Sequence, residues 1–268
     1  MNRSLAFKPP GRAPLVFLGH GSPLNSVRDN EFTRRLVRLG RELPEPAAVC
    51  VVSAHWLSRG ETRVGTSERP GTLHDFGGFP AELYALQYPA PGSPRYAREL
   101  IECVSQVPVR EDAQRELDHG AWSMLLHLWP AADVPVFQMS IDWDQPQAWH
   151  FALAQELRAL RECGVLLLCS GNIVHNLGRL SAHEEDPQIA PWASEFDAWA
   201  AARLEARDFA ALIDHERQGP NARLAVPTND HYLPFVYALG ALAEGEALRT
   251  LHTGFQYGSI SMRCFASA

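Results

Sequence analysis

Four short, largely apolar runs constrain the fold of this chain more than any other feature. They are Leu15–Leu18, Ala47–Ser53, Val134–Met139 and Val165–Cys169, and stretches with helical character lie between them. A strand that is apolar along its whole length is buried on both faces, as in a parallel sheet covered by helices. The pattern therefore predicts an α/β fold with a central, mostly parallel or mixed sheet and helices on both faces.

The segments between the apolar runs have the spacing of amphipathic helices. Within Pro146–Cys163, apolar residues recur at helical intervals from Trp149 to Leu160, and a proline suits the first turn. Further helices are expected at Glu31–Glu42, Arg95–Val104, Gly120–Trp129, Pro191–Ala206 and Tyr232–Ala243, with shorter strands at Thr62–Thr66 (edge-like), Leu248–Leu251 and Ile260–Phe265. No break in composition divides the chain, so we predict one domain over residues 1–268.

Composition excludes several classes of protein. The 24 Lys and Arg against 31 Asp and Glu give a net charge of -7, with no basic block of the kind a nucleic-acid binder presents. The longest apolar run, Ala47–Val52, is too short to cross a membrane. The 5 Cys are odd in number and widely spaced, which indicates reduced thiols rather than a disulfide framework. No secretory signal precedes the first strand, so we expect a cytoplasmic protein.

The segment Glu68–Pro94 is rich in Gly and Pro and is expected to be a long irregular loop. A loop of this length inside a compact domain is more often a functional lid than a linker. We therefore expect it to shape a pocket.

The 11 histidines are the unusual part of the composition, and three of them follow buried strands. Gly19-His20 follows the first run, Ala54-His55 follows the second, and His175 comes shortly after Val165–Cys169. Ligands of open α/β sheets bind beyond the carboxyl ends of the strands. Three imidazoles are therefore expected around one point at this edge.

Two further histidines stand at the starts of predicted helices. His231 follows Asn229 and Asp230, either of which is expected to cap the helix that it opens, and His119 lies at a loop-to-helix junction. Neutral imidazole suits Zn, Fe, Cu and Ni, and three protein ligands with a vacant corner are typical of catalytic sites. The alternative for each residue alone is an ordinary polar side chain hydrogen-bonded at a strand end.

The other histidines carry weaker signals. His74, in the long loop, is a candidate for either the pocket mouth or the surface, and His127 is expected to be structural. The histidines interpreted as solvated are His150, His183, His215 and His252. Other catalytic signatures, including H-E-x-x-H, G-x-S-x-G and the phosphate-binding glycine motifs, do not occur.

Six short segments around these histidines resemble one family. In chain order they are Gly19–Pro23, Ser53–Trp56, Leu73–Pro80, Leu117–Trp122, Ser170–Asn176 and Asn229–Pro234. The chain resembles the class III extradiol ring-cleavage dioxygenases, most closely the bacterial 4,5-DOPA dioxygenase-like branch. The resemblance covers most of the chain.

The resemblance implies a non-haem Fe(II) enzyme that opens a catecholic ring with O2 to give a semialdehyde. His20 and His55 match metal ligands of the family, and His231 falls where the wider family carries a carboxylate ligand. His175 matches an active-site histidine, either an acid/base or a fourth ligand when zinc is bound, and His119 matches a pocket histidine implicated in proton transfer. An all-imidazole set also holds Zn(II) well, so the metal in a purified sample need not be the working metal.

Two other functions compete with this interpretation. A zinc hydrolase would use the same cluster to activate water, with Asp118 or Asp230 as the base. A non-catalytic metal-binding or interaction protein would keep the fold and a closed site. The sequence shows no heptad or exposed apolar stripe that would indicate an oligomeric state.

Overall fold

The four apolar runs form four adjacent strands at the centre of one sheet in the computed structural model, which describes residues 12–182 and 188–267. In sheet order they are β5 (Val136–Asp142), β2 (Ala48–Ser58), β6 (Val165–Gly171) and β1 (Leu15–Gly19), and each neighbouring pair is parallel. Four more strands complete an eight-stranded mixed sheet in a single α/β domain. The predicted fold class is confirmed.

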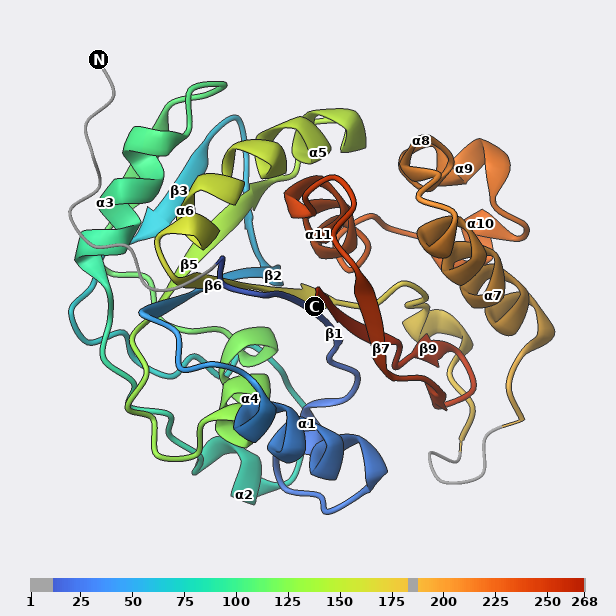
Figure 1. Ribbon diagram of the computed structural model, residues 1–268. Coiled ribbons are helices and arrows are strands. Elements are labelled where there is room, and N and C mark those ends of the chain that lie inside the picture. The colour runs from blue at the N-terminus through green and yellow to red at the C-terminus, as the bar shows by residue number, and fades with distance from the viewer. Residues whose placement is uncertain (1–11, 183–187, 268) are drawn as a thin grey trace.

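The outer strands and the helices complete the architecture shown in Figure 1. β3 (Thr62–Gly65) runs antiparallel to β5 and β4 (Val109–Asp112) lies outside it, while β10 (Cys264–Ser267) and β7 (Leu248–His252) extend the other side. A separate ribbon joins β8 (Phe255–Gln256) to β9 (Ile260–Ser261).

The helices are α1 (Glu31–Glu42), α2 (Ala81–Tyr84), α3 (Pro94–Cys103), α4 (His119–Leu128), α5 (Gln147–Glu156), α6 (Arg158–Glu162), α7 (Pro191–Glu205), α8 (Phe209–Ile213), α9 (His215–Gln218), α10 (Ala222–Ala225) and α11 (Leu233–Ala241), with 3-10 turns η1 (Pro23–Ser26) and η2 (Leu177–Arg179). None of the helices in the described ranges is both long and apolar enough to cross a bilayer.

Each face of the sheet carries its own apolar core. Helices α3, α5, α6 and α11 cover one face, and α1 and α4 cover the other (Figure 1). Along β1, Leu15 and Phe17 pack into the first core, whereas Val16 and Leu18 pack into the second. A strand between two helical layers buries both sets of its alternating side chains, which explains why these runs are continuously apolar.

Three predicted elements differ from the structure. The predicted helix Pro146–Cys163 is divided at Leu157 into α5 and α6, where the Arg158 guanidinium donates to the Gly240 carbonyl. Thr62–Thr66 is not the edge, because the short polar strand β4 pairs outside it. The single strand expected at Ile260–Phe265 is split between β9 and β10. All three differences depend on tertiary contacts that local periodicity does not record.

The parallel register brings the carboxyl ends of the central strands to one edge. Gly19 at the end of β1 pairs with Gly171 at the end of β6, and Ser53 of β2 pairs with Ser170. Contrary to the sequence prediction, β2 does not end before His55 but continues through it, with a register shift against β5. The edge at which the histidines were expected to meet is therefore formed as predicted.

Candidate metal centre

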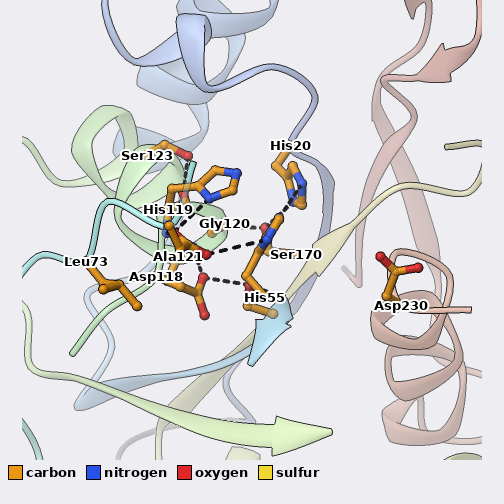
Figure 2. Close-up of polar contacts among 12 residues, drawn as sticks. His20, His55, Leu73, Asp118, His119, Gly120, Ala121, Ser123, Ser170 and Asp230 are labelled. Atoms are coloured by element: carbon orange, nitrogen blue, oxygen red, sulfur yellow. Dashed lines mark hydrogen bonds and ion pairs between the residues drawn. The ribbon is translucent and has the colours of Figure 1, made fainter. Parts of the chain in front are cut away.

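Three of the predicted histidines meet at this edge of the sheet. His20 follows β1, His55 lies in β2, and His231 precedes α11; one ring nitrogen from each lies within 4.8 Å of the other two. The Nε2 atoms of His20 and His55 are 3.4 Å apart, and Figure 2 shows the two rings facing one another. The spacing suits a single ion held by three imidazoles.

A hydrogen bond on Nδ1 fixes the tautomer of His20. Ser170 Oγ donates its only hydrogen to the Gly120 carbonyl at 2.5 Å, so it can only accept from His20 Nδ1 at 3.0 Å. Nδ1 therefore carries the proton, and Nε2 keeps a free lone pair. Burial also lowers the pKa of His20, and the neighbouring histidines lower it further, which keeps the ring in the neutral form that binds metal.

His231 is oriented in the same way by a carboxylate. Its Nδ1 donates to Asp230 Oδ2 at 2.8 Å, which leaves Nε2 free. Burial opposes ionisation of Asp230, but hydrogen bonds from His231 and Thr228 outweigh it and hold the pKa of the carboxyl well below its ordinary range. Such carboxylate–histidine pairs orient metal ligands and raise their basicity. The prediction that Asn229 or Asp230 caps the following helix is wrong. α11 begins later, at Leu233, and no side chain caps it.

A glycine allows the His231 segment to approach the sheet. The Asn172 amide donates to the His231 carbonyl at 2.8 Å, beside the end of β6. A Cβ on Gly171 would lie 2.3 Å from that same carbonyl oxygen. The absence of a side chain at Gly171 is therefore a condition for His231 to lie beside His20 and His55.

The long Gly/Pro loop contributes Asp75 to the site. Asp75 Oδ1 accepts from both the backbone amide and Nδ1 of His119, each at 2.9 Å, and Asp75 Oδ2 is 3.5 Å from His55 Nδ1. Burial opposes ionisation of Asp75, yet its hydrogen bonds with His119 keep the pKa of the carboxyl below its ordinary value. His55, Asp75 and His119 also form a second group whose candidate ligand atoms lie within 4.8 Å. The carboxylate contacts with both rings favour an orienting role for Asp75.

Asp118 is fully buried, and both of its carboxylate oxygens already accept hydrogen bonds. It caps α4 through the Ala121 amide, accepts from Ser53 Oγ at 2.7 Å, and accepts from the side chains of Arg115 and Gln138 at 2.8 Å. A carboxylate with these partners has no free lone pair directed at a metal-bound water. Asp230 differs, because its Oδ2 is bonded to His231 while its buried Oδ1 has no hydrogen-bond partner among the described residues. The structure therefore argues against Asp118, but not against Asp230, as the base of a zinc hydrolase.

His175 and His119 flank the three central rings. The His175 ring stacks on His231 at a centroid distance of 3.5 Å and an interplanar angle of 7°, while His119 lies 3.9 Å from His55. His175 is not among the ligand atoms that lie within 4.8 Å of one another. Burial and, next in size, the adjacent His231 together lower the pKa of His175 to about 2, so its ring is neutral.

A pocket of about 480 Å³ opens over these rings. All five histidines line it, together with Asp75 and a set of apolar and glycine-rich segments. The other lining residues are Gly21, Ser22, Pro23, Phe76, Gly77, Phe79, Leu177, Leu180, Tyr257 and Ile260. The volume is in the range of small-molecule sites, and the loop Glu68–Pro94 does shape the pocket, as predicted.

The predictions for the remaining histidines are only partly correct. His74 Nε2 donates to the Leu86 carbonyl of its own loop at 3.0 Å, and His74 does not line the pocket. His127 Nε2 donates to the Asn25 carbonyl and is structural, as expected. The prediction that His150 and His215 are solvated is wrong: both are fully buried. His252 is half-buried beside Phe32, and His183 lies outside the described residues.

Sequence reasoning missed the residues that orient the rings. Asp75 and Ser170 lie within segments that resemble the family, but no spacing rule connects Asp75 to His119 or Ser170 to His20. Both contacts join segments far apart in the chain. The only local signal was that each residue lies in a segment matching the family.

Residues 15–264 match the catalytic LigB subunit of aromatic ring-opening dioxygenase. The chain belongs to this family of class III extradiol dioxygenases. It is 45% identical to a 4,5-DOPA dioxygenase extradiol of Escherichia coli K12, over 94% of this chain and 93% of the relative. It is 33% identical to a protein of the same description from Beta vulgaris, over 91% and 92% of the two chains.

A solved structure has a similar fold. The crystal structure of an uncharacterized Escherichia coli K12 protein superposes with a TM-score of 0.82 at 39% identity, covering 96% of this chain and 100% of the other. The protein is thus a ring-cleaving dioxygenase by family.

Proposed function

We propose that this dioxygenase opens the ring of a DOPA-like catechol with O2, at an Fe(II) ion held by His20, His55 and His231. The observation that carries the proposal is the convergence of these three rings at the floor of a pocket flanked by His119 and His175. The descriptions of the relatives, as 4,5-DOPA dioxygenases, support the choice of a catechol.

The donor set fits such an ion. The tautomers of His20 and His231 leave Nε2 unprotonated, and the ligand atoms of all three histidines lie within 4.8 Å of one another. Imidazole nitrogen suits Fe(II) and also Zn(II). We therefore expect Fe(II) in the active enzyme and Zn(II) as a competitor for the same ligands.

A bound Fe(II) would supply the Lewis acidity that favours ionised catechol and the electron transfer that lets O2 react with the ring. The protein's own residues would then accept a proton from the substrate and return it to the product. Since Asp75 accepts from His119 Nδ1, the Nε2 of His119 is the atom available to take a catechol hydroxyl proton. We assign the return of a proton to the cleaved product to His119 and His175, which line the same pocket.

The overall step balances without another co-reactant. The ring C–C bond beside the two hydroxyls breaks, both atoms of O2 enter the product, and the proton taken from the hydroxyl is returned. The product is a ring-opened semialdehyde that carries a carboxylic acid. A closed, non-catalytic site would not leave the 480 Å³ pocket that opens over the rings.

The test is anaerobic reconstitution with Fe(II), followed by L-DOPA or other catechols and air. We expect O2 uptake together with a yellow ring-opened product, and neither with Zn(II) nor without O2. No uptake across a catechol panel would refute the proposal, and activity with Zn(II) in the absence of O2 would favour hydrolysis. Normal turnover by His175→Ala would remove the proton-transfer role of His175.

A further inference from the structure

We infer that Gln256 is a positioning residue for the metal ligand His20 and that it acts together with Asn25. Gln256 ends β8, in the hairpin that β8 forms with β9, and Asn25 lies in the turn η1 after His20. The inference rests on the proposed ligand role of His20. It concerns the side chains that hold the His20 segment in place, neither of which lines the pocket.

The segment around His20 needs such support because of its own sequence. His20 stands between Gly19 and Gly21, and Gly21 has a backbone φ of +63°. Glycine loses more conformational freedom on ordering than any other residue. If the segment were not already ordered, metal binding would have to order it, and the affinity would fall by that cost.

The β1 side of His20 is held by the sheet. The Gly19 amide donates to the Arg263 carbonyl at 3.2 Å, and the His20 amide donates to the Gly171 carbonyl at 3.0 Å. On the other side, side chains take over. Asn25 Nδ2 donates to the His20 carbonyl at 3.1 Å, and Gln256 Oε1 accepts from the Ser22 amide at 2.9 Å.

These backbone contacts also fix how the two side chains face one another. A backbone amide can only donate and a carbonyl can only accept, so the oxygen and nitrogen of each side-chain amide are assigned. In that orientation Gln256 Nε2 donates to Asn25 Oδ1 at 2.8 Å, and Asn25 Nδ2 donates to Gln256 Oε1 at 3.3 Å. The two amides therefore form a reciprocal pair, which we call the amide pair.

Burial makes the amide pair demanding. Asn25 is fully buried and Gln256 is 8% exposed, and a buried polar group that loses its partner is costly. The ligand segment also packs closely on it, because a Cβ on Gly21 would lie 2.3 Å from Gln256 Oε1. A shift of Gln256 would therefore move the backbone next to His20.

The amide pair is anchored at both ends. The Asn25 carbonyl accepts from His127 Nε2 of α4 at 2.8 Å. On the hairpin, the Ser261 amide donates to the Val174 carbonyl, beyond the end of β6, at 3.0 Å. Gln256 thus connects the His20 segment to a hairpin that is itself fixed to the sheet.

The test is Gln256→Met, which keeps the length of the side chain but removes its amide. We measure the Kd of Zn(II) by competition with a chelator, the absorption spectrum of the Co(II)-loaded protein, and the free energy of unfolding without metal. We expect Kd to rise about 10–100-fold and the Co(II) spectrum to change, because residues that orient a ligand have effects of this size.

Gln147→Met is the matched control. Gln147 Oε1 accepts from Nδ1 of the buried His215 at 3.2 Å, so this substitution also removes a side-chain hydrogen bond from a buried group. We expect it to lower the free energy of unfolding but to leave Kd and the Co(II) spectrum unchanged. A rise in Kd that is equal in both variants would reflect a general loss of stability and would overturn the inference.

Asn25→Leu tests the other half of the amide pair. It should also raise the Kd of Zn(II), because the His20 carbonyl loses its donor. Since the two side chains act as one unit, the double variant should lose no more affinity than the weaker-binding single variant. Additive losses would show that Gln256 and Asn25 act separately and would contradict the pair.

The outcomes separate this inference from the proposed function. If the parent bound no Zn(II), or if His20→Ala kept the parent's Kd, the proposed ligand set would fail. If His20→Ala lost its metal while Gln256→Met kept the parent's Kd and Co(II) spectrum, the positioning role of Gln256 would fail and the ligand set would stand.

Discussion

The histidines of the pocket and those of the core share burial but differ in what surrounds them. His20 in the pocket and His150 and His215 in the core are all buried, and burial lowers the pKa of each. In the core, His150 Nδ1 bonds the Tyr237 hydroxyl at 3.0 Å and His215 Nδ1 bonds Gln147 Oε1 at 3.2 Å. The Nε2 atoms of both have no hydrogen-bond partner among the described residues.

The comparison shows that neither burial nor a low pKa distinguishes a metal ligand. The pocket histidines differ in that separate segments of the chain direct their ring nitrogens to one point, and hydrogen bonds fix the tautomers of His20 and His231. The core histidines are isolated, and their rings pack beside tyrosines: His150 lies 5.3 Å from Tyr237 and His215 lies 4.2 Å from Tyr232. Geometry among several residues is therefore the criterion.

The largest expected effect comes from removing a converging ring. His20→Ala should lower metal affinity and ring-cleavage activity by about 100-fold or more, since one of three ligands is lost. Metal content after dialysis and O2 uptake measure this. His215→Gln is the control from the core and should keep its metal. Unchanged metal content in His20→Ala would contradict the ligand assignment.

A smaller effect is expected from the group that orients the pocket rings. Asp75→Asn keeps the size of the side chain but weakens its bonds to His119 and His55, so kcat should fall about 10–100-fold. Substrate KM should change less, because Asp75 acts through the rings. Asp214→Asn, next to the core residue His215, is the matched control and should not alter kcat. A KM effect alone would point to direct substrate contact instead.

The elements that could be predicted from the sequence are those that a local pattern of residues determines. Continuous apolar runs specified the four central strands, and helix Glu31–Glu42 has the predicted bounds because it begins at the capping box of Asn30 and Thr33. All five candidate histidines line the pocket. The strand-end argument nevertheless grouped His175 with His20 and His55, whereas the third member of the close group is His231, from the start of a helix. The resemblance, rather than spacing, supplied their roles.

What could not be predicted depends on distant segments. Burial of His150 requires α5 to pack on α11, and nothing near His150 in the chain records that contact. Likewise, Asp75 reaches His119 only because the long loop folds back over α4. Its location in the loop was visible in the sequence, but its partners were not.

The smallest expected effect is a pH dependence of stability caused by the core histidines. Burial lowers the pKa of both His150 and His215 to about 4, against an ordinary value near 6.5. Between these pH values the unfolded chain binds protons that the folded protein does not. The free energy of unfolding is therefore highest above pH ~6.5 and falls as the pH drops towards ~4.

Each such histidine contributes a slope of about 1.4 kcal/mol per pH unit at most. Denaturant unfolding of His150→Gln and the parent should show slopes that differ by up to this amount below pH ~6.5 and coincide above it, because the pocket histidines titrate equally in both. Identical slopes at all pH values would mean that His150 is protonated as readily in the folded protein as in the unfolded chain, and its burial would then not separate it from a solvated histidine.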